Sequence, residues 1–240
     1  MTIEQYISAG SSIAAFLAAF ATFLTVWQIA KQRRTTYRPE IVVKRGLVLT
    51  TGDLKNPDLK SLLNWKRSDN EVDTRADFMG RNYPLFLVNI GMGTATNVLA
   101  IWDFPLEAFV AYVRQLQNAH DCPVDIEYKK GTVSVSGRQA VASFWNSQRE
   151  THFDYILPTS VKTEPTEILL PHSYILAVSV CAGVFVRNYE ESGPKVPPLK
   201  LSLEFYDIAG KKHRMSYDIH FVWPDATPYV FEAELVPIRV

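Results

Sequence analysis

Cysteine is scarce in this sequence. Cys122 and Cys181 are the two thiols among 240 residues. Two cysteines are too few for the disulfide framework of a small secreted domain, and they suit a reducing compartment. A single disulfide between them is the alternative that the sequence leaves open.

Charge of one sign is not in excess, because 25 basic residues balance 25 acidic residues. Binding to nucleic acid calls for a broad basic face, which a balanced chain does not provide. The sequence therefore predicts no nucleic-acid partner. One local cluster stands out, since Lys31, Arg33, Arg34 and Arg38 lie close together with a single acid, Glu40, beside them.

Charge is missing altogether between Ile7 and Ala30. These residues would form a helix about 36 Å long, enough to cross a hydrocarbon core of about 30 Å. Trp27 lies near the charged end, where an indole favours the membrane interface. The segment predicts a transmembrane helix. A cleaved signal peptide would need a basic start and a small-residue cleavage site, and a buried core helix is rarely apolar all round.

The orientation of this helix follows from its flanks. Lys31, Arg33, Arg34 and Arg38 follow the apolar segment, and no basic residue precedes it. The positive-inside rule therefore predicts an external N-terminus and a cytoplasmic domain at a bacterial inner membrane. A periplasmic domain with reversed topology is the alternative. The same cations would also attract anionic lipid.

The predicted span has two different faces. At 100° per residue, Gly10, Ala14, Ala18 and Thr22 share one face, and large aromatic side chains occupy the opposite one. Small residues at this spacing let helices approach closely, which predicts a homo-oligomer or a partner helix. The alternative is that alanine is simply common in such spans.

The sequence divides into a tail with the span (1–30), a basic linker (31–40) and a domain (41–240). We expect a first strand at Ile41–Leu49, an irregular stretch at Thr50–Asn82 with a short helix at Leu59–Trp65, and a helix from Asp103 to about Asn118. Alternating or apolar segments of strand length occupy 124–128, 132–136, 151–157, 166–170, 173–181, 199–207, 213–223 and 229–236. Together they predict a mainly β fold, an antiparallel sandwich with one or two short helices.

Residues 83–102 form the clearest local pattern, which predicts strand, glycine turn and strand. Gly91 and Gly93 are expected to allow positive φ, and Asn89 and Asn97 to bond nearby backbone. Together with the N-terminal helix and its basic end, this N-x-G-x-G-x-A-x-N-V hairpin resembles a broad set of uncharacterised bacterial membrane-anchored proteins. The resemblance implies an immunoglobulin-like sandwich and a membrane location, and it implies no activity.

Groupings that could carry chemistry are weak. A dinucleotide site would need a third small residue where Thr96 stands, followed by a helix. His120 and Cys122 are two metal ligands without a second pair. His213 and His220 should point to opposite faces of one strand, whereas Asp218 and His220 share a face. We therefore predict no catalytic residue, no cofactor and no metal.

These observations favour a membrane-tethered, non-enzymatic interaction or sensor module at the cytoplasmic face of the inner membrane. Its expected partners are the lipid bilayer and a protein partner or a second copy of the chain. The alternative function is a membrane-perturbing effector of anti-phage defence that assembles through the transmembrane helix. An enzyme with an unrecognised site is a third class.

Overall fold

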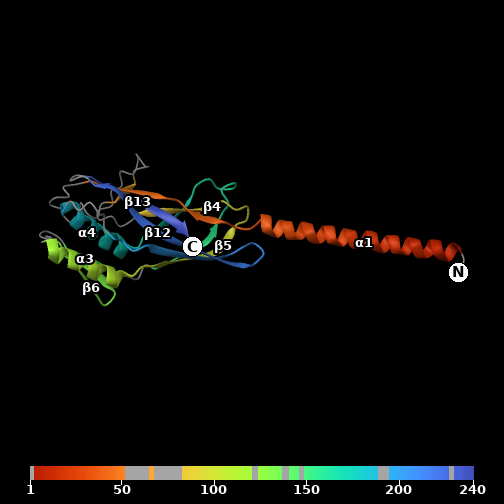
Figure 1. The fold of residues 1–240 in the computed structure, drawn as a ribbon, viewed down its shortest axis with the longest axis horizontal. Helices are drawn as coiled ribbons and strands as arrows, with labels where there is room; N and C mark the ends of the chain where they lie inside the picture. The colour runs from red at the N-terminus through yellow and green to blue at the C-terminus, as the bar shows by residue number, and fades with distance from the viewer. Residues whose placement is uncertain are drawn as a thin grey trace.

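The computed structural model describes residues 3–51, 65–67, 83–120, 124–136, 141–145, 149–188, 195–226 and 230–240. One long helix, α1 (Ile3–Thr36), projects from a β-rich domain along the long axis of that domain (Figure 1). Most of the stretch Thr50–Asn82 lies outside the described residues, and so does the short helix expected at Leu59–Trp65 except for Trp65.

Seven antiparallel strands form the main sheet, in the spatial order β3-β2-β13-β12-β11-β5-β9. Alternate side chains of β11 are buried, as expected for a sheet with one covered face. The strands are β2 (Gly46–Thr51), β3 (Lys66–Arg67), β5 (Ala95–Asp103), β9 (Glu150–Ile156), β11 (Leu199–Tyr206), β12 (Lys212–Ala226) and β13 (Val230–Arg239).

Two smaller antiparallel sheets complete the β structure. The first has the order β1-β4-β10, and the second has the order β6-β7-β8. Their strands are β1 (Ile41–Val43), β4 (Pro84–Asn89), β10 (Thr166–Leu169), β6 (Asp125–Lys129), β7 (Thr132–Ser136) and β8 (Val141–Trp145).

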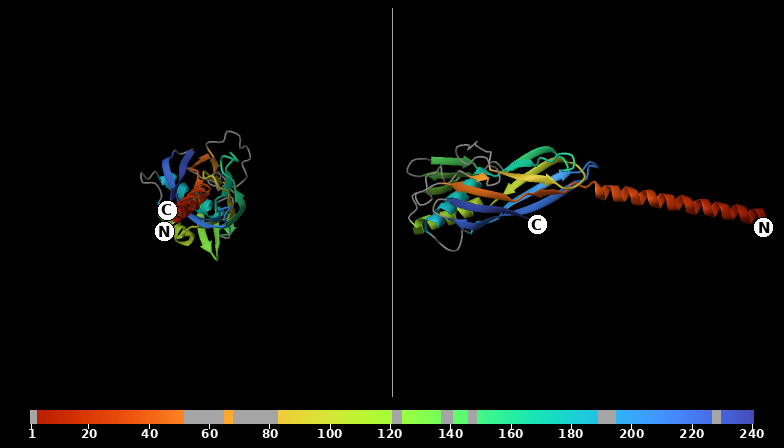
Figure 2. Two further views of the ribbon diagram at one scale, coloured as in Figure 1. Left: turned by 90° about the vertical axis from the view of Figure 1, so that its right-hand side faces the viewer. Right: turned by 90° about the horizontal axis from the view of Figure 1, so that it is seen from above.

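The β1-β4-β10 sheet packs against the main sheet at the end of the domain nearer α1. The Tyr217 hydroxyl on β12 donates a hydrogen bond to the Ile41 carbonyl, and the Tyr83 hydroxyl donates to the Leu47 carbonyl at 2.9 Å. Helices α3 (Leu106–His120) and α4 (His172–Asn188) lie toward the other end (Figure 2). The prediction of a mainly β, antiparallel domain behind an N-terminal apolar helix is confirmed, and so is the helix expected after Asp103.

The prediction of a strand at 173–181 is wrong, because these residues belong to α4. Every residue from Ser173 to Phe185 is buried, so the helix has no polar face and shows no helical period. Its valines and isoleucine resemble a buried strand, and tertiary packing overrides that preference. The Trp65 indole fixes one side of α4 by donating to the Ser179 hydroxyl at 2.7 Å.

Cys181 on α4 is a free, fully buried thiol, so it forms no disulfide with Cys122, which lies outside the described residues. Burial raises the pKa of Cys181 to about 12. In a Cys122→Ser variant we expect a maleimide to label Cys181 at least about a hundredfold more slowly in the native protein than after denaturation. Native labelling at the rate of an exposed cysteine would contradict this position for α4.

Candidate functional site

Asn89 holds the chain that leaves α1 against the domain. Its side chain is 1% exposed, and its amide makes four hydrogen bonds. Oδ1 accepts from the Glu40 and Gly91 backbone amides, each at 3.1 Å, and Nδ2 donates to the carbonyls of Gly93 at 2.7 Å and Ile156 at 3.1 Å. Because a primary amide offers both donors and acceptors, Asn89 joins three separate segments of backbone.

Positions 91 and 93 require glycine because the backbone of Tyr37–Glu40 approaches them too closely to leave room for a side chain. A Cβ on Gly93 would lie 1.8 Å from the Tyr37 carbonyl oxygen, and a Cβ on Gly91 would lie 2.3 Å from the Arg38 carbonyl oxygen. The expectation of positive φ at these glycines is wrong, since the described residues with positive φ are Asn97, Lys130, Gly131 and Gly210. We call the contact of Tyr37–Glu40 with Asn89, Gly91 and Gly93 the clamp.

The two strands that flank the clamp do not form the expected hairpin. β4 pairs with β1 and β10, whereas β5 pairs with β11 and β9, so residues 90–94 connect two different sheets. Asn97 lies within β5 rather than in the turn. Its φ of 48° coincides with a shift in the pairing of β5 with β11, a β-bulge at which asparagine is well tolerated.

The clamp fixes the C-terminal end of α1 to the domain. No described part of the chain covers the rest of this helix. The segment Gly10–Gln32 is long and apolar enough to cross a membrane, and none of it is buried. Trp27 is 55% exposed, and Lys31 Nζ lies 5.5 Å from the centre of its indole ring. Arg33 and Arg34 occupy the last turns of α1, so the helix continues through the basic residues to Thr36.

The small-residue face of α1, made by Gly10, Ala14, Ala18 and Thr22, is exposed, as are the other α1 side chains whose burial is described. The Thr22 hydroxyl donates to the Ala18 carbonyl at 2.9 Å, so this polar group is satisfied within the helix. Phe16 and Phe20 stack on the other side, with ring centres 6.5 Å apart. The face is therefore smooth and suited to contact with another helix.

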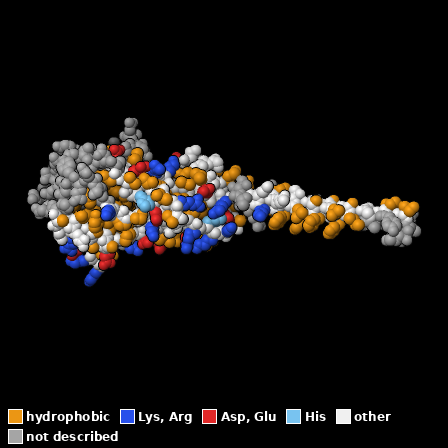
Figure 3. Space-filling view, in the orientation of Figure 1, with side chains coloured by type: hydrophobic (Ala, Val, Ile, Leu, Met, Phe, Trp, Pro, Cys, Tyr) orange, Lys and Arg blue, Asp and Glu red, His pale blue; other side chains and the backbone are white. Residues whose placement is uncertain are grey.

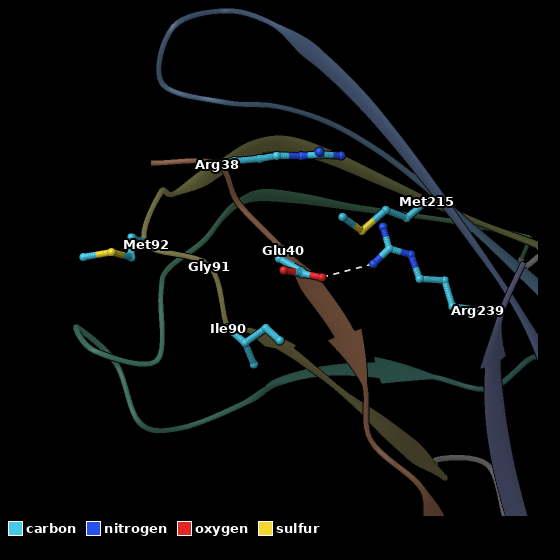
Figure 4. A pocket seen from close by; sticks show the side chains of 7 residues that line it. All are labelled: Arg38, Glu40, Ile90, Gly91, Met92, Met215 and Arg239. Atoms are coloured by element: carbon cyan, nitrogen blue, oxygen red, sulfur yellow. Dashed lines mark hydrogen bonds and ion pairs between the residues drawn. The ribbon is translucent and has the colours of Figure 1, made fainter. Parts of the chain in front are cut away.

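A pocket of about 230 Å³ opens beside the clamp (Figure 4). Glu40 and Arg239 face each other across it with an ion pair of 3.1 Å, and the exposed Arg38 lies at its edge. The other lining residues are Ile90, Gly91, Met92 and Met215. Two arginines against one carboxylate leave this pocket with net positive charge.

A second, larger hollow of about 460 Å³ lies at the start of α3. Its wall is mostly apolar, with Arg149 and Glu107 at its edge, and includes Phe104, Pro105, Leu106 and Tyr128.

Among the side chains that the structure describes, no three metal-binding groups come together here or elsewhere.

His213 and Asp207 form the closest histidine–carboxylate pair of the domain's described part. His213 Nε2 lies 2.8 Å from Asp207 Oδ2, and its ring stacks on Phe205 at 5.5 Å between centres. His213 faces inward and His220 outward along β12, as their odd spacing predicted. Burial opposes ionisation of Asp207, but hydrogen bonds from His213 and from the Lys211 and Ala209 amides outweigh it, so the pKa lies below its ordinary value.

Because the folded state lowers the pKa of Asp207, its carboxylate stabilises the fold above about pH 4 and loses this effect as the pH falls further. We expect Asp207→Asn to lower the free energy of unfolding by about 1–2 kcal/mol at pH 6 and by less at pH 3. Denaturant unfolding at both values measures this difference. Asp218→Asn, on the outer face of β12, is the control and should show no such pH dependence. An equal effect of Asp207→Asn at both pH values would show that the Asp207 carboxylate does not stabilise the fold.

No protein-family profile matches this chain, and no curated protein and no solved structure is significantly similar to it.

Proposed function

We propose that this chain is a membrane-tethered, non-enzymatic interaction module in which α1 crosses the bacterial inner membrane and the β domain stands in the cytoplasm. The observation that carries the proposal is the clamp. It fixes an uncovered apolar helix directly to a folded domain, through Asn89 and two glycines that admit no side chain. Such a joint transmits position and orientation from the helix to the domain.

The continuity of α1 supports a permanent anchor over a removed signal. The helix runs without interruption from Ile3 to Thr36, past the end of the apolar segment. A signal peptide ends instead in a small-residue cleavage site before polar sequence. The basic residues Lys31, Arg33, Arg34 and Arg38 favour a cytoplasmic domain, as argued from the positive-inside rule.

Membrane fractionation with a C-terminal reporter tests this proposal. We expect the full chain to stay with membranes after alkaline carbonate washing, and a reporter after Val240 to be active as green fluorescent protein and inactive as alkaline phosphatase. A chain lacking residues 3–32 should move to the soluble fraction. Release of the intact chain by carbonate, or strong phosphatase activity, would contradict the anchor or its orientation.

Assembly through α1 into a membrane-perturbing effector is the second candidate, favoured by the uncovered small-residue face. Replacing both Ala14 and Ala18 with leucine should reduce in-membrane association at least about tenfold, since bulk there separates the helices. Phe16→Leu on the opposite face is the matched control and should have little effect. Ion leakage that depends on this association would favour the effector. Association that is unchanged when Ala14 and Ala18 are replaced with leucine would exclude assembly through this face.

A further inference from the structure

We infer that the end of the domain next to α1 is a second membrane-contact surface, which binds the headgroups of anionic lipids. The inference rests on the proposed span, and it concerns loops that take no part in crossing the bilayer. We call these loops the rim, formed by residues 90–94, 157–165 and 207–211.

The three loops of the rim lie together around the clamp. Asn89 bridges to Pro158, and its carbonyl accepts from the Thr159 amide at 2.9 Å, which joins the first two loops. The Thr96 hydroxyl donates to the Tyr206 carbonyl at 3.2 Å, which brings the third loop to the same end of the main sheet. All three therefore surround the point where the chain leaves α1.

Exposed apolar side chains concentrate at this end. Outside α1, seven of the large hydrophobic residues that the structure describes have more than half of their surface exposed. Two of them, Ile238 and Val240, belong to the last three residues of the chain, and the other five lie at this end of the domain. The five are Ile90 (57%), Met92 (60%), Tyr155 (60%), Val161 (71%) and Ile208 (67%). Loop tips are usually polar, so apolar residues on three neighbouring tips indicate a surface that is covered in the working protein.

Cations accompany these apolar tips. Lys162 and Lys211 are exposed on two of the loops, and Arg38 lies beside the first. Lys162 Nζ lies 3.9 Å from the carboxylate of Glu164 on the same loop, a pair exposed to solvent on both sides that a lipid phosphate can replace. Figure 3 shows lysine and arginine side chains gathered on the domain near the end from which α1 projects. Apolar tips between cations are the composition that binds an anionic bilayer surface, and the positively charged pocket at Arg38 and Arg239 offers a place for a lipid phosphate.

The length of the linker sets the height of the rim above the membrane. Tyr37, the first residue of the clamp, lies five positions after Gln32, the last residue of the apolar segment. Five helical steps rise about 7.5 Å, and the headgroup layer on each side of a bilayer is about 5–7 Å thick. Since α1 leaves along the long axis of the domain, the rim faces the bilayer at headgroup level (Figure 1).

Fluorescence quenching in nanodiscs tests this inference with the full chain. In a Cys122→Ser background, an environment-sensitive dye is placed at Met92→Cys or Ile208→Cys, and the bilayer carries headgroup-spin-labelled lipid in phosphatidylcholine with or without phosphatidylglycerol. We expect strong quenching at both positions with phosphatidylglycerol and weaker quenching without it. Val222→Cys, exposed on β12 about 33 Å from Lys212 along the strand, is the control and should stay unquenched.

Charge reversal and a label in the span separate the possible outcomes. Lys162→Glu and Lys211→Glu should each weaken binding of the rim to anionic bilayers. The equilibrium ratio of molecules with a lipid-bound rim to molecules with an unbound rim should fall about fivefold in each variant. A dye at Phe20→Cys, read with acyl-chain-labelled lipid, reports the span itself. Quenching at Phe20 with none at the rim, or equal rim quenching in both lipids, would overturn the inference and leave the proposed span intact. No quenching at Phe20 would overturn both.

Discussion

Gly93→Ala should detach the C-terminal end of α1 from the domain. The new Cβ would lie 1.8 Å from the Tyr37 carbonyl oxygen, an atom of the backbone that cannot turn aside as a side chain can. Either the loop or Tyr37–Glu40 must move, which breaks the hydrogen bonds that Asn89 makes to Glu40 and Gly93. We expect a loss of about 2–3 kcal/mol in the free energy of unfolding.

Thermal unfolding in detergent and amide hydrogen exchange measure the two parts of this effect. The midpoint should fall by about 5–10 °C, and the amides of Glu40 and Ile90 should exchange faster because both bond across the clamp. Met92→Ala is the control, since Met92 lies between the two glycines but is 60% exposed. A Gly93→Ala protein with the stability and exchange of that control would show that the clamp is loose.

Leu176→Ala on α4 should produce the other large effect. Leu176 is fully buried within a helix that is covered on all sides, so the truncated side chain leaves a cavity that its neighbours fill only in part. Substitutions of this kind cost about 2–5 kcal/mol. In the full chain we expect the unfolding midpoint to fall by about 5–15 °C.

Leu169→Ala on β10 is the matched control, because it removes the same atoms from a side chain that is 45% exposed. It should cost less than half as much as Leu176→Ala. Equal losses for the two variants would place α4 at the surface and contradict the buried helix.

The sequence predicts a strand where one face of that strand is buried and the other faces solvent. In β11 and β12, buried residues alternate with half-buried or exposed ones, so their sequences carry the period of a strand. α4 was not predictable in this way, because burial on every side removes the polar positions that would show a helical period. The assignment of the domain to an immunoglobulin-like topology stays a prediction.

The clamp was partly predictable from the sequence. Asn89, Gly91 and Gly93 stand out as a motif, but their spacing suggested a turn with positive φ inside one hairpin. The actual reason for the glycines is the backbone of Tyr37–Glu40, about fifty residues earlier in the chain, and no local pattern reveals such a contact. Glu40 and Arg239 were missed for the same reason, since 199 residues separate the two partners.

The rim also lay beyond the sequence alone. Ile90, Val161 and Ile208 are single apolar residues in polar turns, and each is unremarkable by itself. Only the pairing of β4, β5, β9 and β11 brings their loops to one end of the domain, beside the helix that is proposed to cross the bilayer.

The clamp should make α1 and the domain one rigid unit. A pulsed electron paramagnetic resonance measurement between spin labels at Ile29→Cys on α1 and Asp154→Cys on β9 tests it most directly, in bilayers and in a Cys122→Ser background. We expect one narrow distance distribution, which broadens when Gly93→Ala is added. A broad distribution in the presence of Gly93 would contradict it.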